Sequence, residues 1–202
     1  MINLDNSLFN INVNAGIERP HIGGLIVAEP FLREEYFNHA VILMADYAPG
    51  KSSMGLVMNR NTDYMLHEVL DIDGETGRIP LYCGGPLSTD RLFYVHRMPD
   101  LIEGSTPLSD GLWIGGDFDQ VCSYISQGMP TEGNIRFFIG YSGWDAGQLD
   151  NEISNNVWAP ISIPDNFNAL AGEEDSYWHA VVRRMGKRFR NWRLQPMNPA
   201  NN

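Results

Sequence analysis

From residue 23 onward the chain contains short apolar runs, each bounded by proline, glycine or polar residues. Runs of roughly four to eight residues that are rich in β-branched side chains are typical of buried strands. Residues 48–53, with the sequence APGKSS, have the Pro, Gly and Ser content of a turn that joins two paired strands. The pattern predicts strands at residues 24–28, 40–45, 54–59, 80–83, 91–96, 111–115 and 135–140.

Apolar residues at helical spacing occur in fewer segments. Residues 32–37 and 64–70 are each predicted to form a short helix. A longer helix is predicted after Asp117, which is expected to act as its N-cap, with Gln120 as capping-box partner and Gly128 just past its end. Ser176 is expected to cap the last helix, whose inner face consists of Trp178, Val181, Val182 and Met185.

The segment GYSGWDAGQLDNEI, residues 140–153, combines glycines with a helix signal. Its glycines predict a tight turn, and Asp145 and Gln148 have the spacing of a capping box. A Gly-rich turn before a helix can bind phosphate through its N–H groups, but Asp145 would occupy those donors and repel the anion. A nucleophile elbow around Ser142 would need glycine where Trp144 stands. A structural turn with Trp144 in the core is therefore the favoured interpretation.

The order of the predicted elements indicates the fold class. Strands outnumber helices without alternating with them, and several connections are too short for a parallel crossover. The chain is therefore expected to form a mixed or antiparallel α+β fold. Its 202 residues favour a single domain over 1–202, with an N-terminal extension at 1–18, a body at 19–190 and a disordered tail at 191–202.

Four segments together resemble the YqgE/AlgH family of bacterial proteins. In family order they are GGLIVAEPFLREEYFNHAVILM (23–44), GLVMNR (55–60), YCGGP (82–86) followed by LFYVH (92–96), and GYSGWDAGQLDNEI (140–153). The resemblance covers roughly residues 23–186. In this chain Ser142 stands where the family pattern has Ala, and the basic residues 187–193 lie outside that pattern.

The resemblance implies an α+β fold whose bifurcated, mostly antiparallel sheet curls into a partial barrel, with helices packed outside. It implies no defined activity. Some AlgH-like members carry the label of transcriptional regulator, but no recognised DNA-binding motif accompanies that label, and a fold alone does not determine function.

Composition and charge narrow the classes of function. Hydrophobic residues make up 43% of the chain, aromatic residues 11% and charged residues 19%, which is typical of a globular protein. The longest purely apolar run, 40–45, is far shorter than a membrane span, and no Lys or Arg precedes Arg19 to begin a secretory signal. Two cysteines form no disulfide framework. We therefore expect a cytoplasmic protein without a membrane partner.

The formal charge of −11 is unevenly distributed, because six of the 14 basic residues lie in one C-terminal segment. The remaining acidic body repels polyanions, so a dedicated nucleic-acid binder is not expected. Two interpretations of this basic segment stay open: it is a solvated helix end, or it contacts a polyanion. The segment contains Arg183, Arg184, Lys187, Arg188, Arg190 and Arg193.

Cys83 is the residue on which the most specific enzyme hypothesis rests. It ends a predicted strand before a flexible Gly-Gly turn, and His96 on the next strand could face it and activate the thiol. The alternative is a buried, inert core cysteine, which is the commoner case. Cys122 lies on an apolar helix stripe and is expected in the core. The five histidines show no metal-ligand spacing, so neither a metal nor a cofactor is expected.

The favoured function is a non-enzymatic, regulatory or binding protein that takes an unidentified small ligand or protein partner. A thiol enzyme or redox sensor using Cys83 and a transcriptional regulator are the alternatives, and exposed apolar residues would equally serve a homodimer. The expected binding surface combines the two Gly-containing segments with His96 or Asp145 near its mouth. It consists of Gly84, Gly85, Pro86, His96, Tyr141, Ser142, Gly143, Trp144, Asp145 and Gln148.

Overall fold

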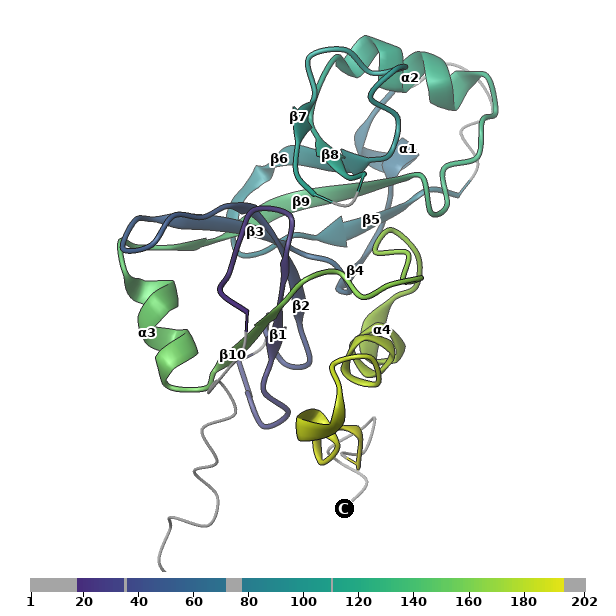
Figure 1. The fold of residues 1–202 in the computed structure, drawn as a ribbon. Helices are drawn as coiled ribbons and strands as arrows, with labels where there is room; N and C mark the ends of the chain where they lie inside the picture. The colour runs from purple at the N-terminus through teal and green to yellow at the C-terminus, as the bar shows by residue number, and fades with distance from the viewer. Residues whose placement is uncertain (1–17, 35, 72–77, 110, 195–202) are drawn as a thin grey trace, which may run out of the picture.

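The computed structural model describes residues 18–34, 36–71, 78–109 and 111–194 (Figure 1). The first half contains β1 (Leu25–Ala28), β2 (Val41–Asp46), β3 (Ser53–Val57), β4 (Asn61–Met65), α1 (Leu66–Val69), β5 (Pro80–Cys83) and β6 (Leu87–His96). The second half contains β7 (Thr106–Pro107), β8 (Trp113–Ile114), α2 (Phe118–Ser126), β9 (Ile135–Trp144), α3 (Gln148–Ser154), β10 (Trp158–Ile161) and α4 (Glu174–Val182). Two 3-10 turns follow, Lys187–Phe189 and Trp192–Leu194.

The strands form one sheet in the order β10-β1-β2-β3-β9-β6-β8-β7, with antiparallel neighbours throughout. The sheet divides along β9. The C-terminal part of β9 pairs with β3 at Gly55↔Ser142, whereas its N-terminal part pairs in parallel with β5 at Tyr82↔Phe138. β5 in turn pairs with β4. The expected bifurcated, mostly antiparallel α+β sheet is confirmed.

The buried apolar side chains form three separate cores, because successive side chains along a strand point to opposite faces of the sheet. The helices lie outside the sheet and cover these cores (Figure 1). On one face of β1 and β2, Leu25 and Leu43 pack with Trp178 of α4. The opposite face places Ile26 and Ile42 in the core that includes α3. The third core joins α2 to the N-terminal part of β9 and to β6. α3 and α4 thus lie on opposite sides of the same strands, outside the sheet.

The helix predicted after Asp117 forms as α2. The Asp117 carboxylate accepts hydrogen bonds from the backbone N–H groups of Asp119 (2.9 Å) and Gln120 (3.2 Å), as an N-cap does. Gln120 is not its capping-box partner, because its side-chain oxygen accepts the N–H of Glu103 instead (2.7 Å). Gly128 follows the helix end with φ +69°, as expected of a terminating glycine.

The largest correction concerns residues 140–145, where a tight turn was predicted. β9 continues through Gly140 to Trp144, and only then does the chain turn into α3. Asp145 does not cap α3; Gly147 occupies the N-cap position, and the Asp145 N–H donates to the Gln148 side chain (3.0 Å). The prediction was wrong because glycines usually interrupt strands, whereas here they allow close backbone packing.

Other boundaries differ from the pattern. Of the described residues of 32–37, residues 32–34 have no regular structure and residues 36–37 lie in a hydrogen-bonded turn, so the predicted helix is wrong there. The segment 64–70 is divided between β4 and the single turn α1. α4 begins at Glu174, and Ser176 lies inside it, where its hydroxyl donates to the Glu173 carbonyl (2.7 Å). Short helices depend on tertiary contacts more than on local spacing.

The chain ends fall partly outside the described residues. The extension predicted at 1–18 is described only at Glu18, whose carboxylate accepts the N–H of Ser162 (2.7 Å). Of the tail predicted at 191–202, Trp192 stacks near Trp178 with ring centroids 6.2 Å apart; residues 195–202 lie outside the description. Within the described chain no helix has the length and apolar character needed to cross a bilayer.

Candidate functional site

The two glycine-containing segments of the predicted surface lie side by side. The Gly84 N–H donates to the Ile139 carbonyl (2.9 Å), and the Ser142 hydroxyl donates to the Gly84 carbonyl (3.1 Å). A Cβ atom on Gly84 would stand 2.3 Å from the Gly140 carbonyl oxygen. Backbone packed against backbone leaves no room for a ligand between the segments. This seam is therefore a structural junction between β5 and β9.

The other residues of the predicted surface are distributed around this seam. Tyr141 packs edge-on against Phe93, with ring centroids 5.8 Å apart, and Trp144 is buried. The exposed members are Pro86, Asp145 and Gln148.

Cys83 and His96 do not form a dyad. Cys83 is opposite Ile139 and His96 is opposite Ile135 on β9, so four residues, or about 13 Å of strand, separate them. The His96 ring is fully buried: Nδ1 accepts the Met98 N–H (3.1 Å), so Nε2 donates to the Gly115 carbonyl (3.0 Å). Cys83 therefore lacks the base that the sequence hypothesis assigned to it.

The burial of His96 predicts how the free energy of unfolding depends on pH. Desolvation lowers the pKa of His96 below its ordinary 6.5, while its bond to the Gly115 carbonyl opposes the shift. The unfolded chain therefore takes up this proton first as the pH falls. We expect the free energy of unfolding to fall as the pH decreases through about 6.5, and urea titrations at pH 7.5 and 5.5 measure the difference.

In His96→Asn the decrease is expected to be smaller. Burial also lowers the pKa of His179, so this histidine contributes to the same pH range. An equal decrease in wild type and His96→Asn would assign the pH dependence to other groups.

The end of β9, helix α3 and the start of β10 together build a carboxylate clamp. The indole N–H groups of Trp144 and Trp158 both donate to one oxygen of Glu152 (2.8 Å each), and the Gln148 amide donates to the other (2.8 Å). These side chains line a cavity of about 260 Å³ together with Phe37. Sequence reasoning singled out Trp144 and Gln148 but missed Glu152. Its position four residues after Gln148, on the same helix face, was the available signal.

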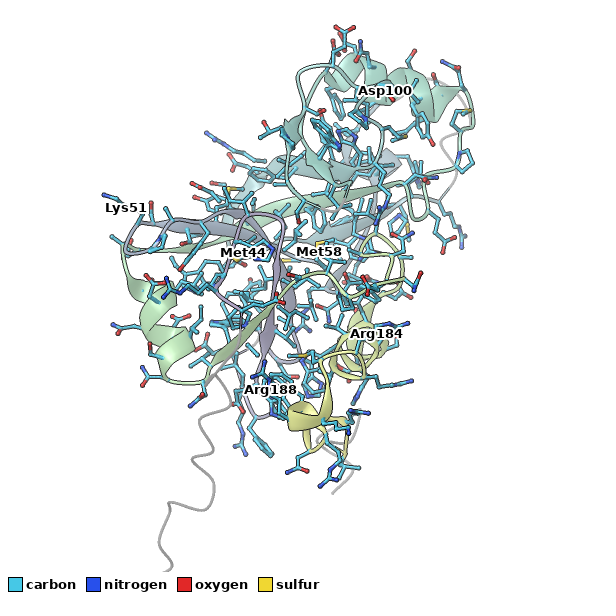
Figure 2. The ribbon with its side chains drawn as sticks, viewed as in Figure 1. Met44, Lys51, Met58, Asp100, Arg184 and Arg188 are labelled. Carbon is cyan, nitrogen blue, oxygen red and sulfur yellow. The ribbon has the colours of Figure 1, made fainter. Side chains whose placement is uncertain are left out.

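The basic C-terminal segment lies at the α4 end of the molecule. Arg184 and Arg188 project there, far from Asp100 near α2 (Figure 2). Arg184 donates to the Ala180 carbonyl (2.8 Å) and lies over the Phe167 ring at 5.4 Å. All six basic residues predicted for a polyanion contact are exposed; they are Arg183, Arg184, Lys187, Arg188, Arg190 and Arg193.

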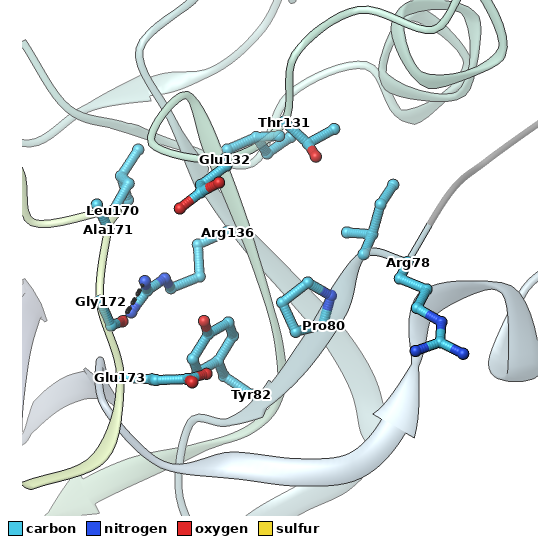
Figure 3. Close-up of a pocket in the computed structure, with 12 residues that line it drawn as sticks. Arg78, Pro80, Tyr82, Thr131, Glu132, Arg136, Leu170, Ala171, Gly172 and Glu173 are labelled. Carbon is cyan, nitrogen blue, oxygen red and sulfur yellow. Dashed lines mark hydrogen bonds between the residues drawn. The ribbon is translucent and has the colours of Figure 1, made fainter.

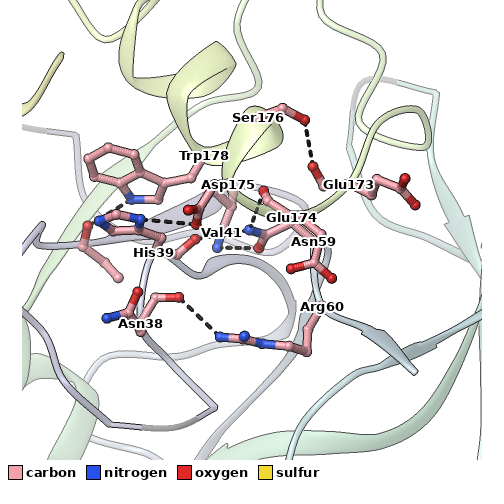
Figure 4. A network of polar contacts seen from close by, with 11 residues as sticks. Asn38, His39, Val41, Asn59, Arg60, Glu173, Glu174, Asp175, Ser176 and Trp178 are labelled. Atoms are coloured by element: carbon pink, nitrogen blue, oxygen red, sulfur yellow. Dashed lines mark hydrogen bonds and ion pairs between the residues drawn. The ribbon is translucent and has the colours of Figure 1, made fainter. Parts of the chain in front are cut away.

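A buried polar network joins β2, β3 and the start of α4 (Figure 4). The Asn59 amide donates to the carbonyls of His39 (2.9 Å) and Glu174 (3.0 Å), and its oxygen accepts the Val41 N–H (2.9 Å). His39 pairs with Asp175 (3.0 Å) and stacks on Trp178. The Asn59 amide thus has its polar atoms paired, and the network positions α4 against the sheet.

No metal-binding cluster of His, Cys, Asp or Glu occurs among the described residues.

The most distinctive site surrounds Arg136, in the N-terminal part of β9. The side chain is only 3% exposed and lies in a cavity of about 310 Å³ beside Tyr82 (Figure 3). Its guanidinium donates to the carbonyls of Met58 and Gly172 (2.7 Å to the latter), and its Cζ lies 4.1 Å from the Tyr82 ring centroid. Among the described residues no carboxylate oxygen lies within 4.0 Å of this cation.

Three exposed charged residues line the same cavity. Arg78 precedes β5, Glu132 lies in the loop before β9, and Glu173 precedes α4 (Figure 3). Desolvation lowers the pKa of Arg136, and interactions with Tyr82 and Tyr177, followed by those with the two glutamates, partly oppose this shift. Arginine remains charged even so. Sequence reasoning missed this site, although one arginine in the otherwise apolar run IRFFIG was a visible signal.

Comparisons with known proteins agree with this fold. A family model described as AlgH-like (DUF179) matches residues 25–190. A UPF0301 protein of Bacteroides thetaiotaomicron is 36% identical over 201 residues, covering 100% of both chains. One of Parabacteroides distasonis is 37% identical over 181 residues, covering 89% of this chain and 90% of its own length.

Two solved structures share the fold. The AlgH protein of Pseudomonas aeruginosa has a TM-score of 0.64 at 24% identity, over 89% of this chain and 97% of that one. A Corynebacterium diphtheriae protein has a TM-score of 0.66 at 20% identity, over 95% of this chain and 98% of that one. The family model and the two relatives show that this chain belongs to the AlgH-like family.

Proposed function

We propose that this AlgH-like protein is a non-enzymatic binding protein whose site is the Arg136 cavity. The ligand class is a small molecule that carries a carboxylate or phosphate group. The observation that carries the proposal is a buried guanidinium with no ion-pair partner among the described residues, placed in a cavity. A buried charge without a counter-ion is costly, and a bound anion supplies one.

The donor geometry supports an anion at this position. A guanidinium has five N–H donors. Two of them donate to the Met58 and Gly172 carbonyls, which fix the orientation of the group, and the other three make no hydrogen bond to a described residue. Bidentate recognition of carboxylate or phosphate uses donors of this kind. The cavity volume of about 310 Å³ is at the lower end of the range for ligand sites, so the ligand is small.

Titration of the 15N-labelled protein with small carboxylates, amino acids and inorganic phosphate tests this proposal. We expect saturable shifts of the backbone amide signals of Ala171, Gly172 and Arg136 with at least one ligand. Arg136→Met is expected to weaken binding at least tenfold, because it removes the charge-assisted hydrogen bonds but retains an unbranched side chain. Arg91→Met removes an exposed arginine that does not line the cavity and serves as the matched control.

Unchanged binding by a folded Arg136→Met variant would contradict the proposal, as would the absence of binding by any of these ligands. Circular dichroism establishes that the variant is folded.

The other functions predicted from the sequence have less support. A thiol enzyme would need a base other than His96, which is about 13 Å of strand away from Cys83. Regulation through DNA would rest on the exposed basic segment alone, and a partner contact would use Pro86, Asp145 and Gln148. A homodimer and a cytoplasmic location stay predictions.

A further inference from the structure

We infer that the ligand of the Arg136 cavity is a zwitterion of the α-amino acid class. Its carboxylate would bind Arg136, and its ammonium group would lie toward Glu132 and Glu173. This inference rests on the proposed function and specifies its ligand class. It follows from the distribution of charge within the cavity, which combines one buried cation with exposed carboxylates.

The two glutamates reach the cavity from different loops, with Arg136 between them (Figure 3). Neither carboxylate is within 4.0 Å of the guanidinium, so they do not neutralise it by direct pairing. Glu132 makes no side-chain hydrogen bond to a described residue, and Glu173 accepts one from the Asn61 amide. The Glu132 carboxylate is thus available to a cationic group of a ligand.

Charge repulsion disfavours a simple anion at this site. Both glutamates and a chain with a formal charge of −11 repel an approaching negative ligand, whereas a zwitterion has no net charge. Its ammonium group converts the repulsion of the two carboxylates into attraction. The cavity lining itself has two cations, Arg78 and Arg136, and two carboxylates, so a ligand with one charge of each sign leaves this balance unchanged.

The remaining walls accept a modest apolar side chain. Ile79, Pro80 and Leu170 line the cavity beside the Tyr82 ring. Apolar walls around a few convergent polar groups are typical of small-molecule sites. The volume of about 310 Å³ favours a free amino acid over a longer peptide.

The test compares matched ligands. The twenty common L-amino acids are screened by thermal shift and by NMR titration, and the tightest binder is compared with its deaminated acid and its α-amide. We expect the amino acid to bind at least tenfold more tightly than either analogue, because each analogue lacks one charge-assisted contact. Glu132→Gln is expected to weaken amino-acid binding several-fold without weakening binding of the deaminated acid.

Glu103→Gln, an exposed glutamate that does not line the cavity, is the matched control. Equal binding of the amino acid and its deaminated acid would overturn this inference and leave the anion-binding function intact. Binding of simple acids or phosphate but of no amino acid would have the same meaning. No binding by any ligand would overturn both.

Discussion

Gly84→Ala is expected to destabilise the protein by about 3 kcal/mol or more. The added Cβ would stand 2.3 Å from the Gly140 carbonyl oxygen and 3.0 Å from a Leu56 methyl carbon. The oxygen belongs to the backbone, so relief requires β5 to move away from β9. That movement would strain the hydrogen bonds that Gly84 makes with Ile139 (2.9 Å) and Val57 (3.0 Å). Urea unfolding, or the failure of the variant to fold, measures the effect.

Gly50→Ala is the matched control for this prediction. Apart from its chain neighbours, no described residue has an atom within 4 Å of a Cβ at Gly50, whose φ is +69°, so only backbone strain of about 1 kcal/mol is expected. A Gly84→Ala variant as stable as the Gly50→Ala variant would show that the seam between β5 and β9 opens easily. The surface predicted around Gly84 and Gly85 would then be accessible to a ligand after all.

Glu152→Ala is expected to destabilise the protein by about 2–4 kcal/mol. The substitution leaves the indole N–H groups of Trp144 and Trp158 without their acceptor, and these side chains are only 6% and 2% exposed. It also removes the link to Gln148 that fixes the first turn of α3. Water entering the adjacent cavity would restore part of the lost hydrogen bonding, which limits the effect. Thermal and urea unfolding provide the measurement.

Two variants separate the clamp from a general effect of charge. Glu34→Ala removes an exposed glutamate that lines the same cavity, and its carboxylate makes no hydrogen bond to a described residue. It is expected to change stability by less than about 0.5 kcal/mol. Glu152→Gln retains an acceptor oxygen for the indoles and is expected to lie between the two. Equal stability of Glu152→Ala and Glu34→Ala would show that the clamp contributes nothing.

The two parts of β9 have different roles: one contributes to the Glu152 clamp and the other to the Arg136 cavity. The C-terminal part ends at Trp144, whose indole fixes α3 through Glu152. The N-terminal part carries Arg136, a buried cation beside a cavity. The structural prediction at Glu152 therefore concerns stability, whereas substitution of Arg136 tests binding.

The sequence by itself determined the elements whose signals are local. Apolar runs predicted the central strands within a few residues, because a strand buried on both faces needs apolar side chains throughout. Asp117 predicted the start of α2, because a helix N-cap satisfies nearby N–H groups. The family resemblance added the bifurcation of the sheet, which no local pattern could indicate.

Only the tertiary structure decided the extent of β9 and the location of the sites. Gly140 and Gly143 belong to a strand because Gly85 and the start of β6 approach them closely, a contact between residues about 50 positions apart. His96 and Cys83 lie apart because of strand register, which a single sequence does not specify. Arg136 is a candidate binding residue only in the folded protein. Folding brings Glu132, Glu173 and the carbonyl of Met58 from three separate segments to the site around it.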